Sequence, residues 1–336
     1  MLIAVAVFPG AIFIFGAWYR QFETSRRLSL FYAAALFSGA FGPLLAYGIS
    51  FISVGKGDFT QGWRWIFIIE GLITVAAGLV APWFLADFPE RAKWLTPRQR
   101  HIATTRVSAN DKSEDFVHPT IRESMKMLLD WKLGIYSLQY FIITSSGYSL
   151  SFFAPIILRQ GMGFDYSKAQ LLLSPPYVFT IVAGFGLAWV SDKQKTRWPI
   201  LLAQACVGIV GLLITLYGKL PGVRYFGLFI AIFGITSNTP ATLAYGQSNT
   251  ASQQKKGVAA AAMITMGAVG GICGSTIFRA QDAPTYYPGM WTTIGMQVMY
   301  IVMTFMLSQH LKRQNRLLEE GKIAELEGVE GFRYAP

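Results

Sequence analysis

Nine long apolar stretches, separated by short polar loops, are the feature that most constrains how this chain can fold. They span 2–19, 29–52, 63–86, 132–158, 170–190, 198–217, 223–245, 257–278 and 288–308. Each contains about 18 to 27 residues, and a helix of this length, at ~1.5 Å per residue, covers a hydrocarbon layer of ~30 Å. Only 14% of the residues are charged, against roughly 25% in a soluble domain. The sequence therefore predicts an all-α integral membrane protein with nine transmembrane helices.

The loops between the stretches differ in charge according to the side of the membrane on which they would lie. When loops are assigned alternately to two sides, one set together with the C-terminal tail holds 21 Lys and Arg residues, and the other holds at most seven. Because basic residues are retained in the cytoplasm, the first set is predicted to be cytoplasmic. We therefore expect a protein embedded in the lipid bilayer, with a cytoplasmic C-terminus and the plasma membrane as its location.

The composition excludes several other classes of function. The net charge of +11 resides in short loops beside apolar stretches, so membrane topology explains it and we expect no nucleic-acid partner. Both cysteines, Cys206 and Cys273, lie inside apolar stretches, and the three histidines lie in predicted cytoplasmic segments, so no metal site is expected. The chain has no G-x-S-x-G, H-E-x-x-H or P-loop motif. We expect neither enzyme activity nor a cofactor.

A charged segment, 87–131, divides the chain into two unequal parts, with three stretches before it and six after it. Six spans after a hydrophilic linker are typical of one half of a twelve-helix transporter. Within the segment, Thr96 followed by Pro97 predicts the start of a short helix that ends near Val107. We expect the C-terminal tail to continue the last span as a helix and then to be solvated. The predicted parts are a partial N-terminal bundle (1–86), a cytoplasmic linker (87–131), a six-helix bundle (132–308) and a cytoplasmic tail (309–336).

Several short blocks of the chain are rich in Gly, Pro and aromatic residues. The blocks are Phe8-Pro9-Gly10, Trp18-Tyr19-Arg20, Glu23, Arg26-Arg27, Ser38–Gly42, Leu44–Gly48, Gly62–Gly71, Phe88-Pro89-Glu90, Trp94–Thr96, Asp282-Ala283-Pro284, Tyr287, Gly289 and Phe332-Arg333-Tyr334. They resemble blocks of the major facilitator superfamily, and most closely those of the anion:cation symporter family, in particular its fungal allantoate permease branch. The similarity extends over essentially all 336 residues, and it implies that the first three helices of the family are absent.

The resemblance implies the major facilitator fold, with a complete second half and a partial first half. It also implies a secondary active transporter that works as a monomer by alternating access of two helical bundles. The implied solute is a small organic anion, namely an allantoate-like or vitamin-like carboxylate, carried together with a proton. Because three helices are missing, an alternative stays open: a truncated, non-transporting remnant or a membrane sensor of the same fold.

The loop after the fifth stretch resembles a signature loop of the superfamily. A carboxylate in such a loop can lie at a helix N-terminus, where unpaired N–H groups carry partial positive charge. The resemblance implies that this helix is the one that begins near Ser25, so we expect Asp192 to lock the cytoplasmic side. The alternative is a charged loop that only sets membrane topology. The motif residues are Asp192, Lys193 and Arg197 in the loop, with Glu23, Arg26 and Arg27 near the partner helix.

Polar side chains on the fourth and seventh stretches are the candidates for binding a solute. The resemblance implies that these stretches line a central cavity, and Pro155 and Pro240 can bend them and free backbone groups. Polar packing between helices explains the same side chains equally well. No Lys or Arg lies in the middle of any stretch, so a cation that would attract an organic anion is not evident. The candidates are Gln139, Tyr140, Thr144, Tyr148, Asn238 and Thr239.

Two further features concern charge and packing. Glu70 is the one carboxylate well inside a stretch, where a charge costs on the order of 3 kcal/mol. An ion pair with the nearby Arg64, a helix cap and a role in proton coupling all stay open.

Small residues let membrane helices approach closely, either at a contact that opens and closes or in static packing. In the eighth stretch these residues are Gly267, Gly270, Gly271 and Gly274.

Overall fold

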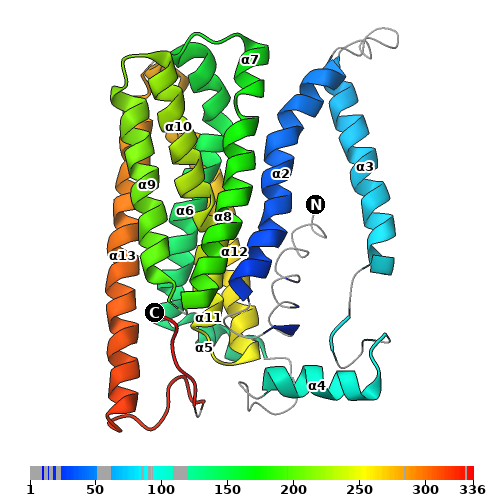
Figure 1. The fold of residues 1–336 in the computed structure, drawn as a ribbon, viewed down its shortest axis with the longest axis vertical. Coiled ribbons are helices and arrows are strands. Elements are labelled where there is room, and N and C mark those ends of the chain that lie inside the picture. Colours follow the sequence, from blue (N-terminus) through cyan, green and yellow to red (C-terminus); the bar gives the residue numbers. More distant parts are fainter. Residues whose placement is uncertain are drawn as a thin grey trace.

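The computed structural model shows a helical protein (Figure 1). It describes residues 10, 14, 18–19, 24–50, 62–84, 87–89, 92, 94–108, 120–194, 196–283, 285–329 and 331–336. Within this part of the chain, eight helices are long and apolar enough to cross a membrane, and they match eight of the nine predicted stretches. The remaining stretch, 2–19, lies almost entirely outside the described residues. The predicted all-helical membrane fold is confirmed.

Two helices precede the linker and stand beside the larger bundle. They are α2 (Thr24–Ser50) and α3 (Gly62–Phe84). In Figure 1, α2 runs along the bundle, and α3 lies on the far side of α2. The side chains along the most apolar part of α3 are not buried against any other part of the protein. Such an apolar surface suits lipid chains, which agrees with a membrane location.

The linker forms two short helices whose starts are fixed by local hydrogen bonds. Helix α4 (Pro97–Ser108) begins where the sequence predicts it, because the Thr96 hydroxyl accepts from the N–H of Gln99 and the Gln99 side chain accepts from the N–H of Thr96. Helix α5 (Ile121–Leu128) has the same reciprocal cap, formed by the residue before it and Glu123. Each cap pairs N–H groups that a helix N-terminus leaves unpaired.

The C-terminal bundle holds the remaining helices, which cross it in alternating directions (Figure 1). The predicted span 223–245 is two helices that meet at Ser237, and the predicted last span continues well past residue 308. The helices are α6 (Trp131–Ile156) with the π-turn η2 (Ile157–Gly161), α7 (Tyr166–Leu171), α8 (Ser174–Gln194), α9 (Trp198–Tyr217), α10 (Pro221–Thr236), α11 (Asn238–Ser248), α12 (Gln253–Ile277) and α13 (Tyr287–Glu319).

Proline explains both irregular places in the bundle. Pro240 has no N–H to donate to the carbonyl of Thr236, four residues earlier, and the span breaks into α10 and α11 next to that carbonyl. Pro155 lies near the end of α6, and the wider η2 turn follows directly. Both irregular segments therefore lie beside prolines that the sequence analysis singled out as able to bend these helices.

Glycines allow α9 and α10 to pack with their backbones in contact. A Cβ added to Gly227 would meet the Thr215 side chain at 2.7 Å, and one added to Gly234 would meet the Gln204 carbonyl at 2.7 Å. Neither distance leaves room for a methyl group, so both positions require glycine. Contact of this kind holds membrane helices together by dispersion, because lipid removes the usual hydrophobic drive.

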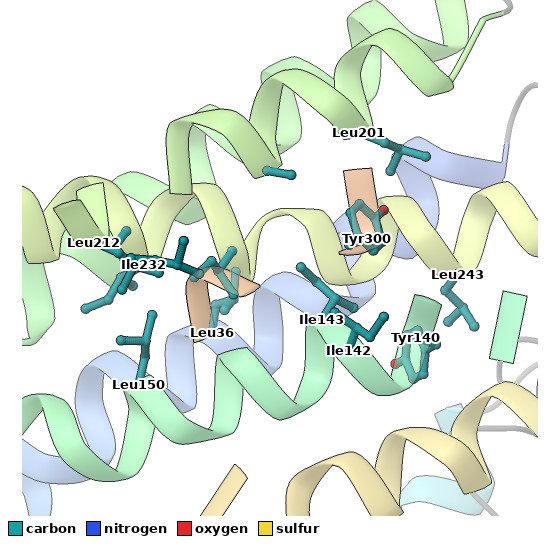
Figure 2. Packing of buried hydrophobic residues seen from close by; sticks show 14 of the residues in the cluster. Leu36, Tyr140, Ile142, Ile143, Leu150, Leu201, Leu212, Ile232, Leu243 and Tyr300 are labelled. Atoms are coloured by element: carbon teal, nitrogen blue, oxygen red, sulfur yellow. The ribbon is translucent and has the colours of Figure 1, made fainter. Parts of the chain in front are cut away.

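One apolar core joins α2 to the C-terminal bundle. Leu36 of α2 belongs to the same buried cluster as Ile142, Leu150, Leu212 and Ile232 of the bundle (Figure 2). The two parts of the chain therefore share a packed interior rather than only touching at their surfaces.

The chain after α13 differs from the expected solvated tail. It turns back from Glu319 and ends against the bundle, where Tyr334 and Ala335 are buried (Figure 1). The described parts of 309–336 therefore include both the predicted helical extension and a packed segment that hydropathy did not indicate.

Candidate functional site

The candidate site lies where α2 meets the C-terminal bundle. The side chain of Tyr32, in the first half of α2, lies close to the side chain of Thr239 at the start of α11. Further along α2, the carbonyl of Ala40 accepts a hydrogen bond of 2.7 Å from the hydroxyl of Ser174, the first residue of α8. The contact between α2 and the bundle is therefore polar as well as apolar.

Three tyrosines of the bundle gather around Tyr32. The side chains of Tyr140, Tyr148 and Tyr177 lie close enough to Tyr32 to interact with it electrostatically. The Tyr177 hydroxyl is also hydrogen-bonded to that of Ser151, at 2.9 Å. Tyr148 is 48% exposed, whereas Tyr140 and Tyr177 are buried. We call this set the interface cluster: Tyr32, Tyr140, Tyr148, Ser151, Tyr177 and Thr239.

A second set of polar side chains lies wholly inside the bundle. The amide of Gln139 donates to the hydroxyl of Thr304 at 2.9 Å, and the amide of Asn238 donates to the carbonyl of Leu201 at 3.1 Å. The Tyr300 hydroxyl donates to the Asn238 side-chain oxygen at 3.3 Å. These hydrogen bonds join α6, α9, α11 and α13. We call this set the bundle network: Gln139, Asn238, Thr242, Tyr300 and Thr304.

The structure thus divides the predicted solute-binding residues between two environments. Gln139 and Tyr140 are neighbours in sequence, but side chains one residue apart on a helix point about 100° apart. Gln139 faces the bundle interior, and Tyr140 faces the interface cluster. The same holds for Asn238 and Thr239 at the start of α11. Thr144 donates to the carbonyl of Tyr140 in its own helix, at 2.6 Å.

Three residues of the interface cluster, Tyr32, Ser151 and Tyr177, were not among the predicted candidates. Tyr32 and Tyr177 lie on α2 and α8, while the prediction considered only the fourth and seventh stretches. An aromatic hydroxyl inside an otherwise apolar stretch is the signal that could have found them. It is a weak signal, because tyrosine also occurs at the ends of membrane helices.

The four glycines predicted to pack closely in the eighth stretch face α6, within the same bundle. A Cβ added to Gly270 would lie 2.6 Å from the Phe141 carbonyl, and one added to Gly274 would lie 2.5 Å from the Ser145 carbonyl. The other two, Gly267 and Gly271, lie against tyrosine rings of the interface cluster. These glycines therefore let α12 approach α6 and leave room for the tyrosines.

The signature loop holds an ion pair of its own. Asp192, near the end of α8, pairs with Arg197 before α9, at 3.4 Å. Lys193 lies over the ring of Trp189, one helical turn earlier, at 5.3 Å. The side chain of Ser25 lies outside the described residues, so the expected contact between Asp192 and the start of α2 stays a prediction.

Arg197 is the most deeply buried cation of this loop, with 2% of its surface exposed. Burial lowers its pKa to about 10, and the nearby carboxylate of Asp192 opposes that shift. A pKa of this size still leaves the guanidinium charged at neutral pH. A buried charge of this kind is stable only when it is paired, so Asp192 and Arg197 depend on each other.

Part of the predicted partner motif also lies in the described chain. The Arg27 guanidinium lies 3.7 Å from the centre of the Tyr19 ring, a cation–π contact. Trp18 stacks on Trp94 of the linker, with ring centres 5.6 Å apart. Glu23 and the side chain of Arg26 lie outside the described residues. Aromatic blocks that are far apart in sequence therefore meet at the linker.

The remaining candidates do not add charge to the interface cluster. Glu70 is exposed on α3, which packs against α2 on the side away from the bundle (Figure 1). In the described residues, no group of three or more His, Cys, Asp or Glu could hold a metal ion. A cavity of about 640 Å³ lies elsewhere, between α5, α6 and α12, and Leu128, Val258 and Met266 line it with other mostly small or apolar residues. The interface cluster is thus a neutral site built from hydroxyl groups.

Comparison with known proteins relates this architecture to one family. A family profile described as Major Facilitator Superfamily matches residues 2–275. The chain is 32% identical over 333 residues to the MFS transporter prlL of a fungal species (strain NRRL 50135), and 29% identical over 319 residues to the high-affinity nicotinic acid transporter of Saccharomyces cerevisiae. These matches cover 97% and 92% of this chain but 66% and 57% of the relatives, so the chain spans about 60% of their length.

Solved structures share the fold at low sequence identity. The crystal structure of the E. coli fucose:proton symporter FucP aligns with a TM-score of 0.65 and covers 89% of this chain and 73% of FucP. That of the human organic anion transporter MFSD10 aligns with a TM-score of 0.59 and covers 88% and 67% of the two chains. Sequence identity is 14% in both cases, so these matches concern the fold alone.

Proposed function

Since the chain belongs to the Major Facilitator Superfamily, we propose that it is a secondary transporter that moves a small organic acid across a membrane by alternating access. The observation that supports this most is the interface cluster, where hydroxyl groups of α2 meet hydroxyl groups of α6, α8 and α11. A site between two parts that move relative to each other is accessible to one side of a membrane at a time. The placement in an allantoate permease-like branch rests on the motif blocks of the sequence.

The chemistry of the cluster favours a small planar acid. Tyrosine rings offer flat apolar faces, and their hydroxyls can donate to a carboxyl or ring nitrogen. The cluster has no cationic side chain, so it suits an acid that binds with its proton attached. Nicotinic acid is the first solute to test, because a relative at 29% identity is named as its transporter.

Binding the protonated acid would couple transport to the proton without a carboxylate in the cluster. Because the acid and its proton cross together as a neutral species, the pH difference drives transport rather than the membrane potential, and each pH unit contributes about 1.4 kcal/mol, which concentrates the solute about tenfold. In this scheme the solute itself carries the proton. Asp192, which is paired with Arg197, then closes the predicted cytoplasmic side by binding the start of α2, and the C-terminus lies on the cytoplasmic side of the plasma membrane.

The proposal is tested by uptake into proteoliposomes that contain the 336-residue chain. We expect labelled nicotinate to enter faster at an outside pH of 5.5 than at 7.5, and a protonophore to abolish its accumulation. A panel of other small carboxylates, including allantoate, then defines the solute class. Uptake that equals protein-free liposomes for every acid tested would contradict the transport proposal. Uptake that does not respond to the pH gradient would contradict the coupling.

A further inference from the structure

The packed C-terminal segment, 326–336, lies against the predicted cytoplasmic end of the bundle. We call it the C-terminal strap. Leu326, Tyr334 and Ala335 are each at most 5% exposed, although they follow an exposed, charged turn after α13. Burial of this degree needs specific partners, because a short segment without regular structure leaves its backbone groups unpaired. The structure supplies partners at three places.

The first place is a charged pocket for Glu327. Its carboxylate accepts from the ammonium groups of Lys132, at the start of α6, and Lys255, at the start of α12. The hydroxyl of Tyr334 donates to the same carboxylate at 2.7 Å, so the strap also pairs with itself. Asp130 lies at 2.5 Å from Lys255 and balances the second lysine. Charge-assisted hydrogen bonds to a buried carboxylate are among the strongest in proteins.

The second place is a pair of asparagines that bind the strap backbone. The Asn315 side chain donates to the carbonyl of Tyr334 at 2.9 Å and accepts from its N–H at 3.0 Å. Asn249 does the same for the next residue, donating to the carbonyl of Ala335 at 3.1 Å and accepting from its N–H at 2.8 Å. Two side-chain amides that each pair both backbone groups of one residue hold an extended chain without contacting its side chains, as an added strand would.

The third place connects the strap to the signature loop. The backbone N–H of Arg197 donates to the carbonyl of Pro336 at 2.9 Å, and the side chain of the same arginine pairs with Asp192. The strap therefore contacts the ends of α6, α9, α11, α12 and α13. It can occupy all three places only while these helix ends keep their present arrangement.

We infer that this end of the bundle is a binding site for an extended peptide, and that the chain's own strap occupies it in cis. The site recognises a carboxylate seven residues before a tyrosine, through Lys132 and Lys255, and the peptide backbone, through Asn249 and Asn315. Occupation clamps the helix ends together and fixes the arginine that pairs with Asp192. This role is independent of which solute the protein carries.

The test removes residues 326–336 from the full chain and supplies them as a synthetic peptide, 324–336. We expect the deletion to lower the Tm of the purified protein by about 3 °C or more and the peptide to restore it. A peptide with Glu327→Gln should need at least tenfold higher concentration, whereas one with Glu325→Gln should act like the natural peptide, because Glu325 is exposed. An unchanged Tm after deletion, or equal potency of all three peptides, would overturn the inference.

A second measurement, made on the intact chain, tests the inference even if the shortened chain does not fold. Trypsin cleaves after Arg333, which is exposed, but the N–H of the next residue is held by Asn315. In the intact chain, Glu327→Gln should speed this cleavage at least tenfold, and Glu325→Gln should leave it unchanged. Equal cleavage rates in the two variants would show that the strap is not held by the charged pocket.

Discussion

The bundle network and the interface cluster contain the same kinds of group, yet they join different parts of the molecule. The bundle network connects α6, α9, α11 and α13, which all belong to one bundle. The interface cluster connects that bundle to α2, which precedes the linker. In the proposed transport cycle, hydrogen bonds inside one unit can persist, whereas those between two units would break. The role of a polar side chain in a membrane helix therefore depends on which helix it faces.

The most direct test of this difference between the two sets is to remove one hydroxyl from the interface cluster. Tyr32→Phe deletes the hydroxyl that lies close to Thr239 and leaves the ring. If the cluster binds the solute, we expect kcat/KM for uptake to fall at least tenfold, about 1.4 kcal/mol or more, with little change in Tm. Tyr217→Phe is the control, because Tyr217 is exposed at the end of α9. Equal uptake by both variants would place the binding site elsewhere.

A methyl group added to a glycine should distinguish the close contact between α12 and α6, inside the bundle, from the looser contact between α2 and the bundle. Gly270→Ala forces a Cβ to within 2.6 Å of the Phe141 carbonyl, between two helices of one bundle. We expect a loss of stability of about 1–3 kcal/mol, measured as a lower Tm. At Gly39 on α2, a Cβ would meet the Tyr177 ring at 3.6 Å, which is ordinary contact. Gly39→Ala should therefore leave Tm unchanged, and an equal loss in both variants would refute the distinction.

The bundle network should respond in stability rather than in uptake. Asn238→Val removes a buried amide that bonds to Leu201 and Tyr300. Hydrogen bonds between membrane helices contribute about 0.6 kcal/mol on average, so we expect a loss of about 1 kcal/mol and a small decrease in Tm. The KM for the solute should not change. A higher KM with an unchanged Tm would mean that the network, and not the interface cluster, binds the solute.

The smallest expected effect is the pH response of the C-terminal strap. Of the bundle network, the interface cluster and the strap, only the strap is held by charged side chains. Burial opposes ionisation of Glu327, but hydrogen bonds from Lys132, Lys255 and Tyr334 outweigh it and hold the pKa of Glu327 below its ordinary value of 4.5. A depressed pKa stabilises the docked strap above pH 4.5, and this stabilisation is lost as the pH falls through the lowered value.

The measurement is the difference in Tm between the natural chain and Glu327→Gln. We expect this difference to stay constant from pH 8 to about 5.5 and to shrink only below pH 4.5. The same comparison for Tyr32→Phe and Asn238→Val should show no pH dependence in that range, because those groups are neutral. A difference that already declines between pH 8 and 6 would mean that Glu327 is not held by the lysines.

Sequence could predict much of the fold, because its main determinants are local. The length of each apolar stretch determines the number of described spans, the hydroxyl of Thr96 determines where α4 begins, and Pro240 determines where one span breaks. None of these features depends on which helices become neighbours. The predicted starts and ends of most described spans are correspondingly close to those observed, and the exception is α13, which continues to Glu319.

The candidate site could be predicted only in part, because the direction of a side chain depends on its neighbours. Hydropathy averages over a whole stretch, so it does not separate Gln139 from Tyr140, although they face different parts of the protein. The strap was missed for a related reason. It is held by the amides of Asn249, at the end of α11, and Asn315, within α13, which are distant in sequence and leave no local pattern.

The break at Ser237 gives the two parts of one membrane span different neighbours. Helix α10 is fixed to α9 by backbone contact at their glycines, and the Ser237 hydroxyl accepts a hydrogen bond of 3.0 Å from Gln204 of α9. Helix α11 begins just beyond the break and carries Thr239 toward α2. The Asn238 amide, one residue earlier, still holds the start of α11 to the carbonyl of Leu201 on α9. A single crossing of the membrane thus spends its first half inside the bundle and brings its second half to the boundary with the N-terminal helices.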